Sequence, residues 1–105
     1  MIENRIRTIL DAPEAGEGAP TLANMEDLLT SAYARSMAIE GEQWRLQRRV
    51  VDVAMELADE YTEPRARELG ELARELRALE DDLSGLRSLI RSLRTRANDV
   101  RANAA

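Results

Sequence analysis

Apolar residues recur at alternating steps of three and four along the last third of the chain. They form one unbroken series: Leu69, Leu72, Leu76, Leu79, Leu83, Leu86, Ile90, Leu93, Ala97 and Val100. This heptad spacing places them along one narrow seam of an α-helix. Because such a seam is buried against another helix, the pattern predicts a long helix over residues 64–101 that has a helical partner.

A second helical pattern precedes the first and supplies that partner. Its seam positions are Leu22, Met25, Leu29, Ala32, Ser36, Ile39, Gln43, Leu46, Val50, Val53 and Leu57. Gly41 lies in the weak middle of this seam and costs a helix interior about 1 kcal/mol relative to Ala. Since the pattern resumes in phase beyond Gly41, we expect one continuous helix over residues 21–61.

The short segment Tyr61–Pro64 separates the two patterns. Proline is tolerated in the first turn of a helix but not in its interior, and it disfavours the α conformation at the preceding Glu63. A connection this short predicts that the two helices are antiparallel neighbours, a coiled-coil-like helical hairpin. A single kinked helix running through Pro64 is the competing arrangement.

The seams predict a register for this hairpin. Its layers include Leu57–Leu72, Val53–Leu76, Val50–Leu79 and Leu46–Leu83. Arg49 then falls opposite the acidic residues 80–82, and Glu26 lies near Arg101. Exposed ion pairs contribute only about 0–1 kcal/mol each, so their predicted role is to select register and orientation.

The first twenty residues differ from the rest of the chain. Residues 1–11 carry Ile2, Ile6, Ile9 and Leu10 on one face of a short helix, and residues 12–20 hold two of the three prolines and two of the five glycines, typical of a flexible linker. Because so short a helix is marginal in water alone, we expect an amphipathic arm that docks on its own hairpin, residues 21–105. A mobile arm that binds a partner or a membrane surface is the alternative.

The helix predicted over residues 21–61 is apolar over a wider arc than one neighbour covers. Beyond its seam it carries Tyr33, Met37, Trp44, Val51 and Ala58. Trp and Met are enriched in the cores of interfaces, and an exposed apolar patch marks an interaction site. We therefore expect a subunit interface at these five residues, in a homodimer whose hairpins form a four-helix bundle. Docking of the arm on this face is the alternative.

The amino-acid composition limits the kinds of functional site that the chain can contain. The chain of 105 residues is 33% charged and only 3% aromatic, and it contains no Cys, His or Lys. Disulfides, zinc sites built on Cys or His, and Schiff-base chemistry are therefore excluded. The carboxylates fall mainly outside the seams, as expected of solvated helix faces. We predict no catalytic residue, no cofactor and no metal ligand, and we do not expect an enzyme.

The resulting prediction is an all-α, non-enzymatic module for oligomerisation or protein–protein interaction, such as an adaptor or a small regulatory subunit in the cytoplasm. No apolar run is long enough to cross a bilayer, and Glu3 with no apolar core around it argues against a signal peptide. A nucleic-acid-associated regulator is one alternative, because residues 87–105 are rich in Arg, although the net charge of −5 argues against it. A peripheral membrane binder that uses residues 1–11 is the other.

Overall fold

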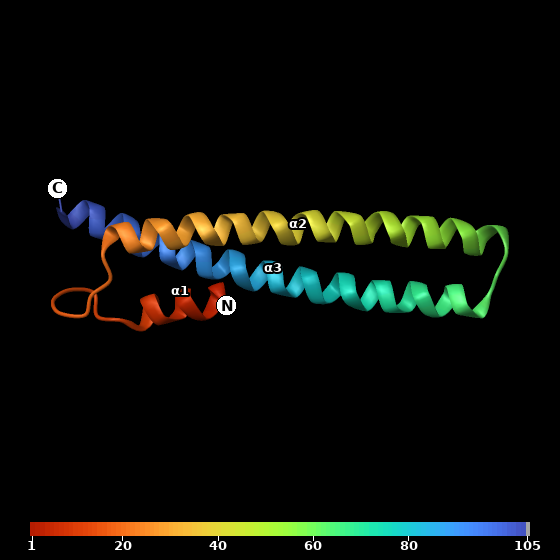
Figure 1. Ribbon diagram of the computed structural model, residues 1–105, viewed down its shortest axis with the longest axis horizontal. Helices are drawn as coiled ribbons and strands as arrows, with labels where there is room; N and C mark the ends of the chain where they lie inside the picture. The colour runs from red at the N-terminus through yellow and green to blue at the C-terminus, as the bar shows by residue number, and fades with distance from the viewer. Residues whose placement is uncertain (105) are drawn as a thin grey trace. The chain divides into compact units, whose positions relative to one another are not determined.

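A computed structural model describes residues 1–104, and this part of the chain contains three helices and no strand. They are α1 (Ile2–Asp11), α2 (Leu22–Asp59) and α3 (Glu63–Ala104), labelled in Figure 1. The predicted all-helical fold is confirmed, and α2 runs through its central glycine without a break.

Local signals set the ends of the long helices. The Thr21 hydroxyl accepts a hydrogen bond from the backbone N–H of Asn24 at 3.1 Å, which caps α2. Pro64 occupies the first turn of α3, where a backbone N–H would have no helical partner to lose. α2 ends at Asp59, so only three residues connect it to α3.

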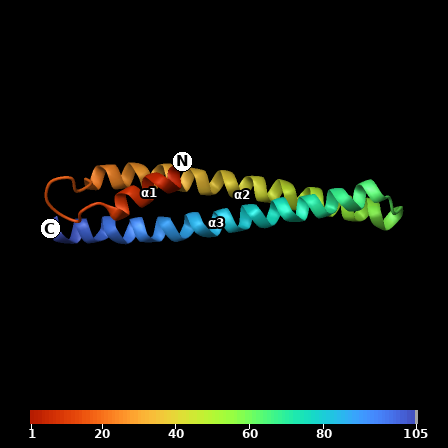
Figure 2. The same ribbon diagram turned by 90° about the horizontal axis from the view of Figure 1, so that it is seen from below.

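The helices contribute to two compact units. The three-helix unit comprises residues 1–37 and 84–104. In it, α1 runs antiparallel to the start of α2 and parallel to the end of α3 (Figures 1 and 2). Its buried apolar residues are Ile6, Met25, Leu28, Leu29, Ala32, Leu86, Ile90, Leu93 and Ala97. The buried Ser36 hydroxyl donates to the Tyr33 carbonyl at 2.8 Å, so the core contains no unsatisfied hydroxyl there.

The two-helix unit, Ala38–Leu83, has a thinner core. Its buried apolar residues are Ile39, Val53, Leu72 and Leu83. The other apolar seam residues are only half-buried: Leu46, Val50, Leu57, Leu69, Leu76 and Leu79. Two helices bury only the strip where they touch, whereas in the three-helix unit α1 covers part of the seam as well. Part of the apolar seam therefore stays exposed in the two-helix unit.

The predicted register is wrong in the two-helix unit. Arg49 forms an ion pair with Glu68 at 2.7 Å, whereas the prediction placed Glu80 opposite it. Those two positions are twelve residues apart on α3, about 18 Å along the helix at ~1.5 Å per residue, which two side chains cannot bridge. The three-residue connection has Tyr61 at its midpoint, so layers pair residues equidistant from it, and Val50 lies level with Leu72.

The corrected register is one heptad away from the predicted one. Centring the register on Tyr61 gives these layers in the two-helix unit: Val53–Leu69, Val50–Leu72, Leu46–Leu76, Gln43–Leu79 and Ile39–Leu83. All of them still place seam residues opposite seam residues, because the pattern repeats every seven residues. In the three-helix unit the predicted neighbours Glu26 and Arg101 do form an ion pair, at 2.7 Å.

Candidate protein-interaction surface

The main exposed apolar feature of the two-helix unit is a stripe along α2 formed by Trp44, Val51 and Met55, which we call the tryptophan stripe. At 3.6 residues per turn these positions fall within roughly 40° of one another around the helix. They point roughly 180° away from Val53, which is buried in the seam. Their side chains are 59%, 55% and 65% exposed. The stripe therefore lies on the face of α2 turned away from α3.

A basic side chain crosses this stripe. The guanidinium of Arg48 lies over the Trp44 ring, 5.3 Å from its centroid, a cation–π contact that orients both side chains. A shallow hollow beside the ring is lined by Trp44, Gln47, Arg48, Val51 and Asp52. Its lining combines an apolar floor with one positive and one negative group. Such a hollow suits a protruding apolar side chain that is flanked by charges.

The five residues predicted as an interface are exposed but not equivalent. Trp44, Val51 and Ala58 lie along the outward face of α2 in the two-helix unit, and all three are exposed. In the three-helix unit Met37 is also exposed, whereas Tyr33 is covered on one face by Arg94, whose guanidinium lies 5.3 Å from the ring centroid. Tyr33 therefore contributes to packing between α2 and α3.

Met55 belongs to the stripe and was missed in the sequence. It occupies the heptad position of Arg48, one that is normally solvated, so the apolar pattern beside the seam does not include it. Its spacing of eleven residues from Trp44, three helical turns, could have identified it.

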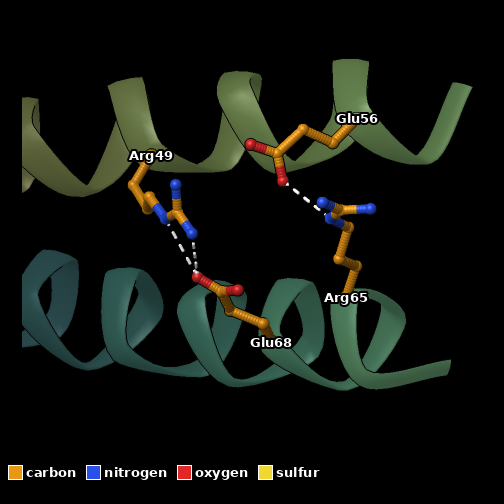
Figure 3. Close-up of polar contacts among 4 residues, drawn as sticks. All are labelled: Arg49, Glu56, Arg65 and Glu68. Atoms are coloured by element: carbon orange, nitrogen blue, oxygen red, sulfur yellow. Dashed lines mark hydrogen bonds and ion pairs between the residues drawn. The ribbon is translucent and has the colours of Figure 1, made fainter. Parts of the chain in front are cut away.

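Ion pairs between α2 and α3 line the flank of the two-helix unit that includes Arg49. Arg49 donates two hydrogen bonds to one Glu68 carboxylate oxygen, at 2.9 and 2.7 Å, and Arg65 donates to Glu56 at 2.9 Å (Figure 3). The hydrogen bond to Glu68, and the attraction of its charge, raise the pKa of Arg49. These pairs are well exposed and add little stability. They do place polar groups where a partner helix would otherwise contact the seam.

Arm docking takes a specific form in the three-helix unit. Ile6 of α1 is fully buried, while Ile2, Ile9 and Leu10 are half-buried. The guanidinium of Arg96 donates four hydrogen bonds of 2.7–2.8 Å to the carbonyls of Ile9, Leu10, Ala12 and Pro13. The last carbonyls of a helix have no partner within it and carry the negative end of its dipole. Arg96 therefore satisfies the end of α1 and holds it on α3, and the sequence did not reveal this role.

The position of the arm follows from the off-seam residues beneath it. Leu28 occupies the same heptad position on α2 as Arg49, and Arg96 the same position on α3 as Glu68. In the two-helix unit these positions hold an ion pair. In the three-helix unit they hold a buried leucine and the arginine that binds α1. The arm thus lies over Leu28 and leaves Met37 exposed.

The Arg-rich end of α3 is largely engaged within the chain. Arg94 lies over Tyr33, Arg96 holds α1, and Arg101 donates to Glu26 and to Asn98, each at 2.7 Å. Phosphate binding would have to compete with these contacts, and the segment has no aromatic side chain to stack on bases. The contacts argue for a structural role of these arginines.

Two further observations concern other kinds of site. Within residues 1–104 no group of three or more Asp or Glu side chains is arranged to hold a metal ion. None of the helices in this part of the chain combines the length and apolar character needed to cross a membrane.

No protein-family model matches the chain, and no curated protein or solved structure shows significant similarity to it.

Proposed function

We propose that this protein is a non-enzymatic helical interaction module that functions as a homodimer, an assembly of four long helices joined through the tryptophan stripe. The observation that carries the proposal is the exposure of Trp44, Val51 and Met55 on a face of α2 that is turned away from α3. Fully burying a side chain of this size contributes roughly 1.5–3 kcal/mol, and a two-fold axis doubles the contribution.

The half-buried seam of the two-helix unit supports the same conclusion. A hairpin of two helices has a small core and is marginal by itself, whereas self-association adds buried area to each copy. Adaptors and small regulatory subunits use faces of this kind to join other helices. The intrachain contacts of the arginines at the end of α3, and of the arm, leave the tryptophan stripe as the surface best suited to a partner.

The test compares the oligomeric state of wild type with that of Trp44→Glu by light scattering and sedimentation over a range of concentrations. We expect a wild-type dimer, and a variant that is monomeric and either helical or partly unfolded. Tyr61→Glu is the matched control: Tyr61 is 72% exposed in the connection and outside the stripe, so this variant should remain dimeric. A monomeric wild type, or a dimeric and fully helical Trp44→Glu variant, would refute the proposal.

A further inference from the structure

We propose that the second copy docks on the tryptophan stripe in antiparallel orientation, with a two-fold axis that passes α2 near Val50 and brings Arg48 of each copy against Asp52 of the other. This inference rests on the proposed homodimer and specifies its geometry. Three properties of the stripe carry it: the order of its residues, the order of the charges beside it, and the shape of the hollow next to Trp44.

The order of residues is self-complementary about that axis. Arg48 and Asp52 lie two residues before and two residues after Val50, so an antiparallel copy places each beside its opposite. The same operation brings Trp44 of one copy to within one residue, about 1.5 Å along the helix, of Met55 of the other. Both contacts occur twice, as in any interface in which one surface pairs with itself.

The charges along one edge of the stripe change sign near this axis. Arg45 and Arg48 precede it, and Asp52 and Asp59 follow it, all exposed and all on the same side of the stripe at 3.6 residues per turn. A two-fold axis perpendicular to antiparallel helices keeps each edge opposite the same edge of the other copy. Antiparallel docking thus joins opposite charges along this edge. In parallel docking the two-fold axis would run along the helices, so this charged edge would face the other edge of the second copy, which over the same length carries Gln47, Ala54 and Ala58 and offers the charges no partner.

The hollow beside Trp44 fits the residue that this geometry delivers to it. Met55 is 65% exposed and carries an unbranched, flexible side chain, and methionine sulfur makes favourable contacts with aromatic rings. The hollow includes Trp44, Arg48 and Asp52 in its lining. Met55 of the second copy would thus enter between an aromatic ring and a charged pair, and it would cover surface that water now occupies.

This geometry also determines how the α2 and α3 helices of the two copies are arranged where their two-helix units pair. Because the stripe lies roughly opposite the seam on α2, the two α2 helices meet in the middle and each α3 lies on the outside. The four helices of the paired units then form a row. A closed bundle would instead require contact faces about 90° apart on each helix.

Charge exchange tests the docking directly. The variants are Arg48→Asp, Asp52→Arg and the double exchange, and sedimentation equilibrium gives the dimer dissociation constant of each. We expect each single variant to raise the dissociation constant about tenfold or more, because it creates two like-charge contacts. The double exchange should restore the constant to within about threefold of wild type.

The matched control uses an Arg and an Asp at the same spacing on another helix. Arg77 and Asp81 are exposed on α3 and, like Arg48 and Asp52, lie four residues apart. Arg77→Asp and Asp81→Arg should leave the dissociation constant unchanged. All of these variants alter exposed side chains, so circular dichroism should show unchanged helix content. If a single variant did lose helix, the dissociation constant of the folded double exchange would still test the contact.

The outcomes separate the docking geometry from the proposed function. A dimer that Trp44→Glu abolishes, but that neither single exchange weakens, would overturn the antiparallel register and leave the interface intact. A dimer that Arg48→Asp tightens would also overturn it, because antiparallel docking places Arg48 beside Asp52 and contains no repulsion for that change to remove. A monomeric wild type would overturn the interface itself.

Discussion

The arginine that holds α1 offers a direct test of the three-helix unit. Arg96→Met keeps most of the length and apolar character of the side chain but removes the guanidinium. Four carbonyls at the end of α1 and the start of the linker, from Ile9 to Pro13, then lose the guanidinium as a donor, although that of Ile9 keeps the backbone N–H of Ala12 at 3.2 Å. We expect α1 to detach from α2 and α3, while the long helices remain folded.

The size of this effect follows from the contacts that hold α1. Hydrogen bonds that involve a charged group contribute about 1.5–3 kcal/mol net, and the buried Ile6 contributes about as much. Alone, a helix of ten residues is marginal in water, so α1 folds only while it is docked. Losing 1.5–3 kcal/mol from docking should lower the protection of the α1 amides roughly 10- to 100-fold, at ~1.4 kcal/mol per factor of ten.

Hydrogen exchange followed by mass spectrometry measures this protection in the peptide that covers α1. Arg94→Met is the matched control, because Arg94 lies two residues away on the same helix and contacts Tyr33 rather than α1. It should leave α1 protected. Equal protection of α1 in Arg96→Met and wild type would show that the hydrogen bonds of Arg96 do not hold the arm, and would assign docking to apolar contacts alone.

Three further predictions address the arm, the linker and the register. Ile6→Ala should release α1 as well, because removing a fully buried isoleucine costs about 2–5 kcal/mol, and the long helices should keep their circular dichroism. Limited proteolysis should cut residues 12–20 first, since most of this linker is exposed and outside any helix; a first cut elsewhere would contradict this. Paired cysteines should form an intrachain disulfide readily when they replace Val50 and Leu72, and poorly when they replace Val50 and Leu79, as non-reducing gels would show; the reverse order would restore the register predicted from the sequence.

Most of the fold could be predicted because helix periodicity is a local property. The seams of both long helices, the proline in the first turn of α3 and the continuity of α2 through Gly41 all follow from short-range patterns. The predicted helix limits differ from the observed ones by only a few residues. The cap that Thr21 forms on α2 is a local feature of the same kind, because its donor, the backbone N–H of Asn24, lies only three residues along the chain.

The register could not be predicted from the apolar pattern, because a shift of one heptad preserves every apolar layer. The predicted register therefore depended on the charges, and it was wrong. An exposed pair such as Arg49–Glu68 reaches across about five residues of offset along the helices, so several registers offer acceptable partners. The length of the connection after Asp59 carries the deciding information, and a change of only a few residues in its assumed limits moves the register.

The candidate surface could be predicted only in part, because some of its residues lie outside the heptad pattern of the seam. Trp44 and Val51 were found because they extend the seam pattern, while Met55 and Leu28 lie outside it. Leu28 explains why the arm docks where it does: an apolar residue replaces a charged one at a flank position, and a third helix covers it. The arm has ten residues and spans about 15 Å, enough to cover one short stretch of the long helices.

The apolar surface that stays exposed in the two-helix unit is the one that the proposed second copy would cover. On the flank of the two-helix unit that includes Arg49, the charged residues form ion pairs at the positions where a third helix packs in the three-helix unit. The exposed apolar residues lie instead on the face of α2 turned away from α3, around Trp44. The charges beside them change from positive to negative at Val50. A helix that only needed to be soluble would carry polar residues on that face. The combination of a flank lined by ion pairs and an apolar, self-complementary outer face favours a second copy of the same chain over another segment of it.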